Sequence, residues 1–257
     1  MRYFIELSYK GTHYAGFQVQ ENANTVQKEI ENALQVFYRQ ELPLTGSSRT
    51  DSGVHARRNY FHFDSAFEIL PKHVYNINAI LPNDIFIRRI FRVKDDAHCR
   101  FHATHRMYQY YISREKDVFA QELSWHYPYK TDINKLNEAA SLLFQYDDYT
   151  SFSKRNTQTF TKLCTILQSE WIEEGDKLVF KVKANRFLRG MVRGLVATQL
   201  QVGRGKISIE SFKQIIEAKN CAKADFSAPA HGLFLEEVGY DFENIMYPAF
   251  YSRSLFT

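Results

Sequence analysis

The stretch that decides the fold at the start of the chain is residues 3–9, Tyr-Phe-Ile-Glu-Leu-Ser-Tyr. Its larger apolar side chains recur at every second position and therefore share one face, which is typical of a β-strand. The residues on that face are Tyr3, Ile5, Leu7 and Tyr9. We therefore expect the chain to open with a strand that packs this face against a core.

Outward from this strand, the pattern predicts an alternation of strands and helices. Asn24 opens a helical pattern, and short strands are expected at 42–48 and 59–64. A second helix follows, begun by Pro71, and a longer strand at 85–93 closes this part of the chain. The first half is therefore predicted to have the order β-α-β-β-α-β.

The remaining sequence predicts the same order again, with one further helix. The expected elements are a strand at 107–112, a helix capped by Asp132, strands at 163–171 and 178–184, a helix from Asn185 to Gly203, a helix capped by Ser208 and a strand at 233–238. Two such runs indicate an α+β protein of two ferredoxin-like halves, with antiparallel sheets side by side and a central basic cleft. We place the N-terminal half at 1–104 and the C-terminal half at 105–257.

The composition excludes several classes of protein. The 257 residues are 44% hydrophobic and 24% charged, which indicates a packed core rather than disorder. The net charge of +4 is compatible with nucleic-acid binding but does not establish it. Cys99, Cys164 and Cys221 are an odd, scattered set and a poor disulfide framework. With neither a signal peptide nor an apolar run long enough for a membrane, we expect a cytoplasmic protein without membrane association.

The densest polar stretch is the loop at 47–58, which joins two expected strands. It places one carboxylate, Asp51, among arginines and a histidine: Arg49, His55, Arg57 and Arg58. Spacing alone favours a turn in which Asp51 caps the backbone. The alternative is a functional carboxylate that neighbouring arginines keep ionised.

A second basic stretch covers residues 185–194. On a helix, Arg186, Arg189 and Arg193 would share one face, at positions i, i+3 and i+7. Such residues are usually solvated, but three like charges on one face repel each other. A phosphate partner would relieve that repulsion.

A third stretch, 100–111, interleaves bases with aromatic residues. In a strand, Tyr108 and Tyr110 would share a face, and most of these rings are expected in the core, with one available for stacking on a base. His98, His102 and His105 have a spacing suited to a metal only if the segment is helical, and its pattern indicates loop and strand. The chain also lacks a phosphate-binding glycine loop and a serine nucleophile motif.

The sequence resembles the tRNA pseudouridine synthase A family in five blocks that occur in the family's order. The blocks are Tyr9 to Gln20, Ser48 to Ala56 (compare G-R-T-D-x-G-V-H-A), Asn78 to Ile85 (N-x-x-L-P-x-D-I), His98 to Tyr110, and Asn185 to Arg193 (N-x-F-x-x-x-M-V-R). One block alone is weak support. Five in order, along most of the chain, are highly specific.

The resemblance implies a role for individual residues. Asp51 matches the catalytic aspartate, and Arg49 matches an arginine that helps to displace the target base. Tyr108 matches a tyrosine that stacks on the target uracil, and Arg193 matches a basic residue paired with the aspartate. The family has two ferredoxin-like halves, acts on tRNA as a homodimer without cofactor or metal, and modifies uridines 38, 39 and 40 of the anticodon stem-loop.

Further residues are expected to contact the phosphates of the RNA: Arg57, Arg58, Arg186 and Arg189. Four positions depart from the family pattern. Ser48 replaces a glycine and would be strained at positive φ, Ser52 replaces an alanine, Lys10 an aspartate and Gly194 an asparagine. None of these removes a catalytic group.

Three alternatives stay open at this point. The chain is a non-catalytic tRNA-binding protein of the same fold, an unrelated small-molecule enzyme with a carboxylate base, or an enzyme of the same chemistry that acts at another RNA position. The intact Arg49-Thr50-Asp51 run argues against the first. Binding to tRNA with a salt-dependent affinity would argue against the second.

Overall fold

A computed structural model describes residues 1–155 and 160–247. These residues form six α-helices and nine strands, so the predicted α+β class is confirmed. Contacts divide them into two units, which are described separately. The first holds Met1–Thr104 with residues 235–247, and the second holds His105–Phe234. No helix of the described residues has the length and apolarity required to span a membrane.

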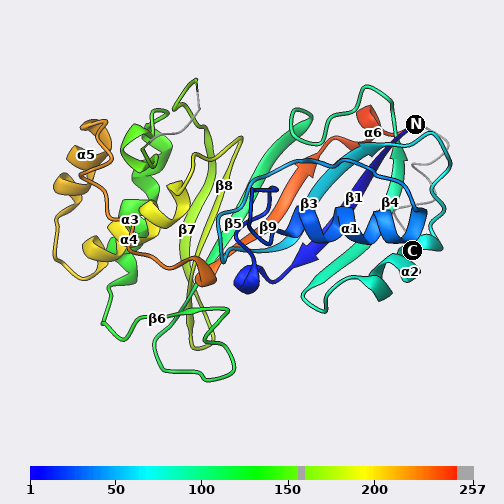
Figure 1. The fold of residues 1–257 in the computed structure, drawn as a ribbon. Helices are drawn as coiled ribbons and strands as arrows, with labels where there is room; N and C mark the ends of the chain where they lie inside the picture. The colour runs from blue at the N-terminus through cyan, green and yellow to red at the C-terminus, as the bar shows by residue number, and fades with distance from the viewer. Residues whose placement is uncertain (156–159, 248–257) are drawn as a thin grey trace. The chain divides into compact units, whose positions relative to one another are not determined.

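The first unit follows the predicted order β-α-β-β-α-β. The order is β1 (Arg2–Tyr9), α1 (Val26–Tyr38), β2 (Thr45–Gly46), β3 (His55–Asp64), α2 (His73–Ile80) and β4 (Ile85–Val93). β1 pairs antiparallel with both β3 and β4, and β2 pairs with β3. β9 (Leu233–Tyr240) is the other neighbour of β3 in the sheet. The helices α1 and α2 lie together on one side of these strands (Figure 1).

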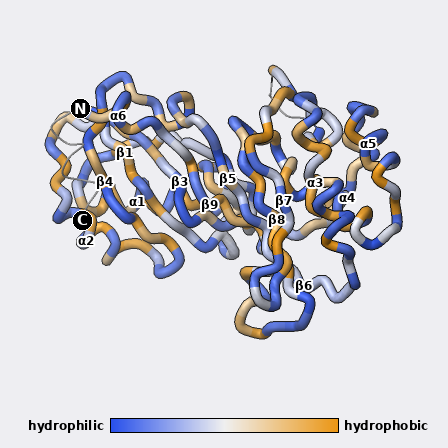
Figure 2. The backbone as a smooth tube through the Cα atoms, turned by 180° about the vertical axis from the view of Figure 1, so that it is seen from behind, coloured by the Kyte–Doolittle hydropathy of each residue, from blue (hydrophilic) through white to orange (hydrophobic). Residues whose placement is uncertain are grey.

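Burial on β1 is more complete than the alternation predicts. Tyr3, Ile5 and Leu7 are buried as expected, but Phe4 on the opposite face is also fully buried. The Phe4 ring contacts those of Tyr60, Phe91 and Tyr240 at 5.6–6.4 Å between centroids. A second aromatic layer therefore covers the face that periodicity alone would leave to solvent. In Figure 2, hydrophobic and hydrophilic stretches alternate along the chain in both units.

Residues 235–247, which the sequence placed in the C-terminal half, group with the first unit. They include most of β9 and the short helix α6 (Phe242–Ile245). Tyr240 anchors them, because its hydroxyl bonds to Ser47 Oγ at 3.0 Å and to the Cys99 carbonyl oxygen. These contacts join residues 141 and 193 positions apart, which no local pattern reveals.

The second unit contains strands β5 (Ala103–Ser113), β6 (Trp125–His126), β7 (Ile166–Glu174) and β8 (Lys177–Ala184). The order is β5-β8-β7, with β6 parallel to β5 and the other two pairs antiparallel. Three helices lie beside β7 and β8 in Figure 1: α3 (Ile133–Leu142), α4 (Met191–Gly203) and α5 (Ile209–Glu217). As predicted, Asp132 and Ser208 cap α3 and α5.

The predicted start of α4 was wrong. The helix begins at Met191, after Gly190 at φ 74°, and not at Asn185. The Asn185 side chain accepts a hydrogen bond from the Thr165 backbone N–H at 2.8 Å, so its oxygen is used outside the helix. Arg186 and Arg189 therefore precede α4, and only Arg193 lies on it. The three arginines do not form one helical face.

Candidate active site

The loop between β2 and β3 presents Asp51 from a largely buried frame. Thr50 and Val54 on either side of it are 7% and 2% exposed, whereas Asp51 is half-buried. The turn is closed by the Val54 N–H, which donates to the Asp51 carbonyl oxygen at 3.2 Å, and by Gly53 at φ 77°. This closing bond thus uses the main-chain carbonyl of Asp51, whereas the turn interpretation expects a bond from its side chain.

A buried polar network supports this loop from below. The Tyr9 hydroxyl and Thr50 Oγ1 are 2.7 Å apart. Asn59 Nδ2 donates to the Ser48 carbonyl oxygen at 2.9 Å and to the Tyr9 hydroxyl at 3.3 Å. Tyr9 and Asn59 are 5% and 0% exposed. Strands β1 and β3 thus fix the backbone immediately before Asp51, and breaking a buried bond of this kind is costly.

The sequence interpretation missed this network. It placed Tyr9 on an apolar strand face and in the first family block, and it gave Asn59 no role. A polar amide at a buried strand position is the available signal, since buried polar groups are normally hydrogen-bonded.

The opening loop after β1 packs directly on the Asp51 loop. The Phe17 N–H donates to the Thr50 carbonyl oxygen at 3.1 Å, and the Gly11 N–H donates to His55 Nδ1 at 3.0 Å. A Cβ atom at Gly11 would lie 2.0 Å from the Val54 carbonyl oxygen. Glycine is therefore required at Gly11 by close approach of two backbones, and the first two family blocks form one structure.

The third family block joins the same structure. The Tyr14 hydroxyl donates to Asp84 Oδ1, and the Lys10 N–H donates to the Asp84 carbonyl oxygen at 2.8 Å. Asn78 and Ile87 exchange two hydrogen bonds of 2.8 Å each. Three blocks that are distant in sequence are thus held together in the first unit.

The serine in place of the family's glycine is not strained. Among the described residues, positive φ outside glycine occurs at Asn22, Arg39 and Lys219. Ser48 is therefore accommodated without the strain expected for a left-handed position.

The arginines of this loop differ in their surroundings. Arg49 is exposed. Arg57 Nε lies 3.1 Å from Glu236, and Arg58 Nε lies 3.7 Å from Glu6, which also pairs with Arg89. Carboxylates partly offset the positive charge of Arg57 and Arg58, whose side chains remain 58% and 57% exposed.

The second unit holds the other predicted site residues. Tyr108 on β5 is 7% exposed, and its ring meets that of Phe187 edge-on at 5.1 Å between centroids. Arg193, in the first turn of α4, donates from Nε to the Ala228 carbonyl oxygen at 2.6 Å. The fourth and fifth family blocks therefore contact each other through Tyr108 and Phe187.

The glycine that replaces an asparagine after Arg193 has a packing reason. A Cβ atom at Gly194 would lie 2.9 Å from the Phe226 ring and 3.3 Å from the Phe152 ring. Both rings cover the start of α4, which leaves no room for a larger residue there.

The predicted site residues fall into two sets, one in each unit. Arg49, Asp51, Arg57 and Arg58 belong to the first unit, and Tyr108, Arg186, Arg189 and Arg193 belong to the second. In the first set, Asp51 is a half-buried residue on a loop that hydrogen bonds hold to its neighbours. A group held in this way suits attack on an electrophilic carbon or removal of a proton.

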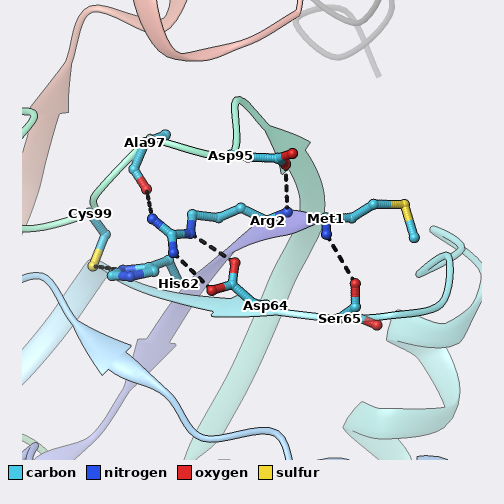
Figure 3. Close-up of polar contacts among 8 residues, drawn as sticks. All are labelled: Met1, Arg2, His62, Asp64, Ser65, Asp95, Ala97 and Cys99. Atoms are coloured by element: carbon cyan, nitrogen blue, oxygen red, sulfur yellow. Dashed lines mark hydrogen bonds and ion pairs between the residues drawn. The ribbon is translucent and has the colours of Figure 1, made fainter.

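Three side chains of types that can bind a metal ion lie close together elsewhere in the first unit. The ligand atoms of His62, His98 and Cys99 lie within 4.8 Å of one another. The Cys99 thiol donates to the Thr45 carbonyl oxygen, and His62 Nδ1 lies 3.1 Å from the Cys99 sulfur (Figure 3). His62 and Cys99 thus bond to each other, whereas His98 Nδ1 accepts from the Arg100 backbone N–H at 3.1 Å. The described residues supply no fourth ligand, and His98, His102 and His105 do not share a helix.

The arrangement around His62 predicts acid sensitivity. Burial, aided by His98 and the Arg2 guanidinium, lowers the pKa of His62 to about 4. The unfolded chain, with a His pKa near 6.5, binds the proton more readily, so stability falls as pH drops from about 6.5 towards 4. We expect His62 to account for a loss of about 2 kcal/mol between pH 7 and pH 5. Urea unfolding at both pH values measures it.

The control for this prediction is His62→Gln, which lacks the titrating group. Its free energy of unfolding is expected to change less between the two pH values than that of the wild type. An equal change in both proteins would assign the acid sensitivity to other groups.

Comparisons with known proteins give the same family as the five sequence blocks. A family model described as tRNA pseudouridine synthase matches residues 7–102 and 139–241. A protein of Parabacteroides distasonis named tRNA pseudouridine synthase A is 46% identical over 241 residues, covering 93% of this chain and 96% of that protein. Proteins of the same name from Bacillus pumilus and Staphylococcus aureus are 39% and 36% identical, over 94% of this chain and 100% and 92% of theirs. The chain therefore belongs to the tRNA pseudouridine synthase family.

Proposed function

We propose that this protein is an isomerase that converts uridine to pseudouridine in tRNA, with Asp51 as the catalytic carboxylate. The observation that carries the proposal is the Asp51 loop. It contains the family motif and is fixed from below by Tyr9 and Asn59. The family membership and the names of the relatives support the same activity.

The reaction breaks the N1–C1′ bond of uridine, turns the base and joins C5 to C1′. The C5 proton is released and N1 gains a proton, so atoms and electrons balance within one nucleotide. A carboxylate near the sugar serves this exchange either by bonding to the base or C1′ or by taking a proton from the sugar. Arg49 would help to displace the target base, as the family resemblance implies.

We further propose that the site draws on both sets of residues. Arg193 would pair with the Asp51 carboxylate and favour its ionised form, and Tyr108 would stack on the uracil. From the family resemblance we also propose a central basic cleft that follows the RNA backbone. The strand order β4-β1-β3, with β2 against β3, supports the ferredoxin-like description of the first half.

The finer properties rest on the family resemblance. We propose that the targets are uridines 38, 39 and 40 of the anticodon stem-loop. We also propose that the protein acts as a homodimer in the cytoplasm and needs neither cofactor nor metal. Size measurement by light scattering tests the dimer.

The role of Tyr108 predicts different effects for two substitutions. Tyr108→Phe keeps the ring and is expected to retain tRNA binding, whereas Tyr108→Ala is expected to lose turnover because the flipped uracil loses its stacking partner. Steady-state rates and tRNA binding measure both. Tyr111→Ala removes a ring from the other face of β5 and controls for loss of packing. Full activity in Tyr108→Ala would rule out stacking.

The test of the proposed function uses tRNA that carries tritium at uracil C5. Pseudouridine formation releases this tritium to water, so the wild-type protein is expected to release it at a rate proportional to enzyme concentration. Chemical mapping of the product then locates the modified positions. Binding of tRNA without release would favour the non-catalytic tRNA-binding alternative.

A further inference from the structure

A basic pocket in the second unit lies outside the set of predicted site residues. It has a volume of about 300 Å³, and none of the described residues that line it is acidic or aromatic. Four of these residues are cationic: Lys154, Arg155, Lys162 and Lys219. Ser153 and Asn220 add a hydroxyl and an amide. The lining is therefore suited to an anion.

Hydrogen bonds hold the segments of this pocket in place. Ser151 Oγ accepts from the Asn220 N–H at 2.9 Å, which ties the residues after α5 to the short helix η3 (Thr150–Phe152). Lys162 Nζ donates to Ser153 Oγ at 3.2 Å. The segments that line the pocket are therefore held to one another by hydrogen bonds.

The charge of the pocket is only partly neutralised within the protein. Lys219 Nζ pairs with Asp148 at 2.9 Å, just outside the lining. Lys154 and Arg155 form no ion pair with any carboxylate of the described residues. Like charges brought together in this way repel, and an anion bound between them would relieve the repulsion.

The pocket adjoins the segment that carries the basic residues of the fifth family block. The Lys154 N–H donates to the Arg189 carbonyl oxygen at 3.0 Å, and Gly190 faces the aliphatic part of the Lys154 side chain. Phe152, the last residue of η3, packs on Gly194 in α4. The pocket therefore lies next to the segment that carries Arg189.

We propose that this pocket binds a phosphate group in the backbone of the RNA substrate, as an anchor in addition to the residues around the target uridine. The inference rests on the proposed function. Lysine and arginine with neighbouring hydroxyl and amide groups are the usual partners of phosphate. A free nucleotide fits less well, because the described residues that line the pocket offer no aromatic ring to stack its base.

The experiment measures tRNA affinity from 50 to 300 mM KCl with the full chain. The double variant Lys154→Gln/Arg155→Gln is compared with Lys116→Gln/Lys130→Gln. The control pair removes the same charge from exposed positions of the same unit outside the pocket. Both pairs carry Asp51→Asn, so that turnover does not alter the RNA during binding.

We expect the slope of log Kd against log salt to fall by about 1 to 2 in the pocket pair, since each lost phosphate contact reduces it by about 0.9. The affinity at 50 mM KCl should fall by about 5- to 30-fold, as expected for the loss of one or two phosphate contacts. The control pair should keep the wild-type slope. Lys154→Arg, which retains the charge and leaves Arg155 intact, should keep the wild-type slope.

Equal slopes in the two pairs would overturn the proposal. A second arm titrates inorganic phosphate at constant ionic strength, followed by NMR. The pocket pair could lose phosphate binding while the salt slope of its tRNA binding stays unchanged. That result would assign the pocket to a free anion and would also overturn the proposal of an RNA anchor. Tritium release by the wild type separates the two proposals. If the wild type releases tritium but the pocket pair and the control pair have equal salt slopes, only the phosphate-anchor proposal is overturned. If the pocket pair has a reduced slope but the wild type releases no tritium, only the proposed catalytic function is overturned.

Discussion

Asp51→Asn is expected to abolish tritium release from C5-labelled tRNA, with a fall in rate of at least about three orders of magnitude. Asparagine has the same shape as aspartate but carries no charge, so it supplies neither a nucleophile nor a base. The bonds made by Thr50 and Ser48 do not involve the Asp51 side chain and should persist. Binding of tRNA should therefore remain within a few-fold of that of the wild type.

The matched control is Ser52→Ala, at the neighbouring exposed position where the family usually has alanine. This change removes one hydrogen bond, from Ser52 Oγ to the Tyr14 carbonyl oxygen, and leaves the carboxylate in place. It is expected to release tritium at close to the wild-type rate. Release by Asp51→Asn as well would show that another residue carries the chemistry.

Gly11→Ala is expected to have the second largest effect, on both stability and turnover. The added methyl group would lie 2.0 Å from the Val54 carbonyl oxygen and 2.7 Å from its carbon, both backbone atoms that cannot rotate away. The opening loop must then separate from the Asp51 loop and break the bond from the Gly11 N–H to His55. We expect a loss of about 3 to 5 kcal/mol in the free energy of unfolding, the range of severe single substitutions.

Gly175→Ala separates this close approach from the general cost of replacing glycine. Gly175 has φ 62°, but a Cβ atom there meets nothing within 4 Å. Its replacement should cost only about 1 kcal/mol from backbone strain and leave turnover intact. Urea unfolding and tritium release compare the two variants. Similar losses in both would contradict the packing argument at Gly11.

Local patterns predicted most elements of the fold. The order in the first unit and the caps Asp132 and Ser208 are confirmed, because caps and apolar periodicity depend on residues only a few positions apart. Helix α1 begins after Thr25, one residue beyond the predicted Asn24. The predicted start of α4 was wrong for a different reason. The Asn185 side chain accepts a hydrogen bond from the backbone N–H of Thr165, which is 20 positions away.

The candidate site shows the same limit. The family motif pointed to Asp51, whereas Asn59 is marked in the sequence only as a polar residue in an apolar strand, and its role depends on Tyr9 across the sheet. The basic pocket was likewise invisible, because Lys154 and Lys219 come from segments more than 60 residues apart. Residue type and short-range spacing do not reveal contacts between residues that lie far apart in the sequence.

The sequence by itself determined the α+β class, the element order of the first unit and the five blocks that identify the family. Only the tertiary structure decided that residues 235–247 group with the first unit, that both faces of β1 are covered and that Asp51 stands on a buried polar network. The physical reason is range. Hydrogen-bonding and packing preferences within a few residues determine helices and strands, whereas a site is made by contacts between segments that only the folded chain brings together.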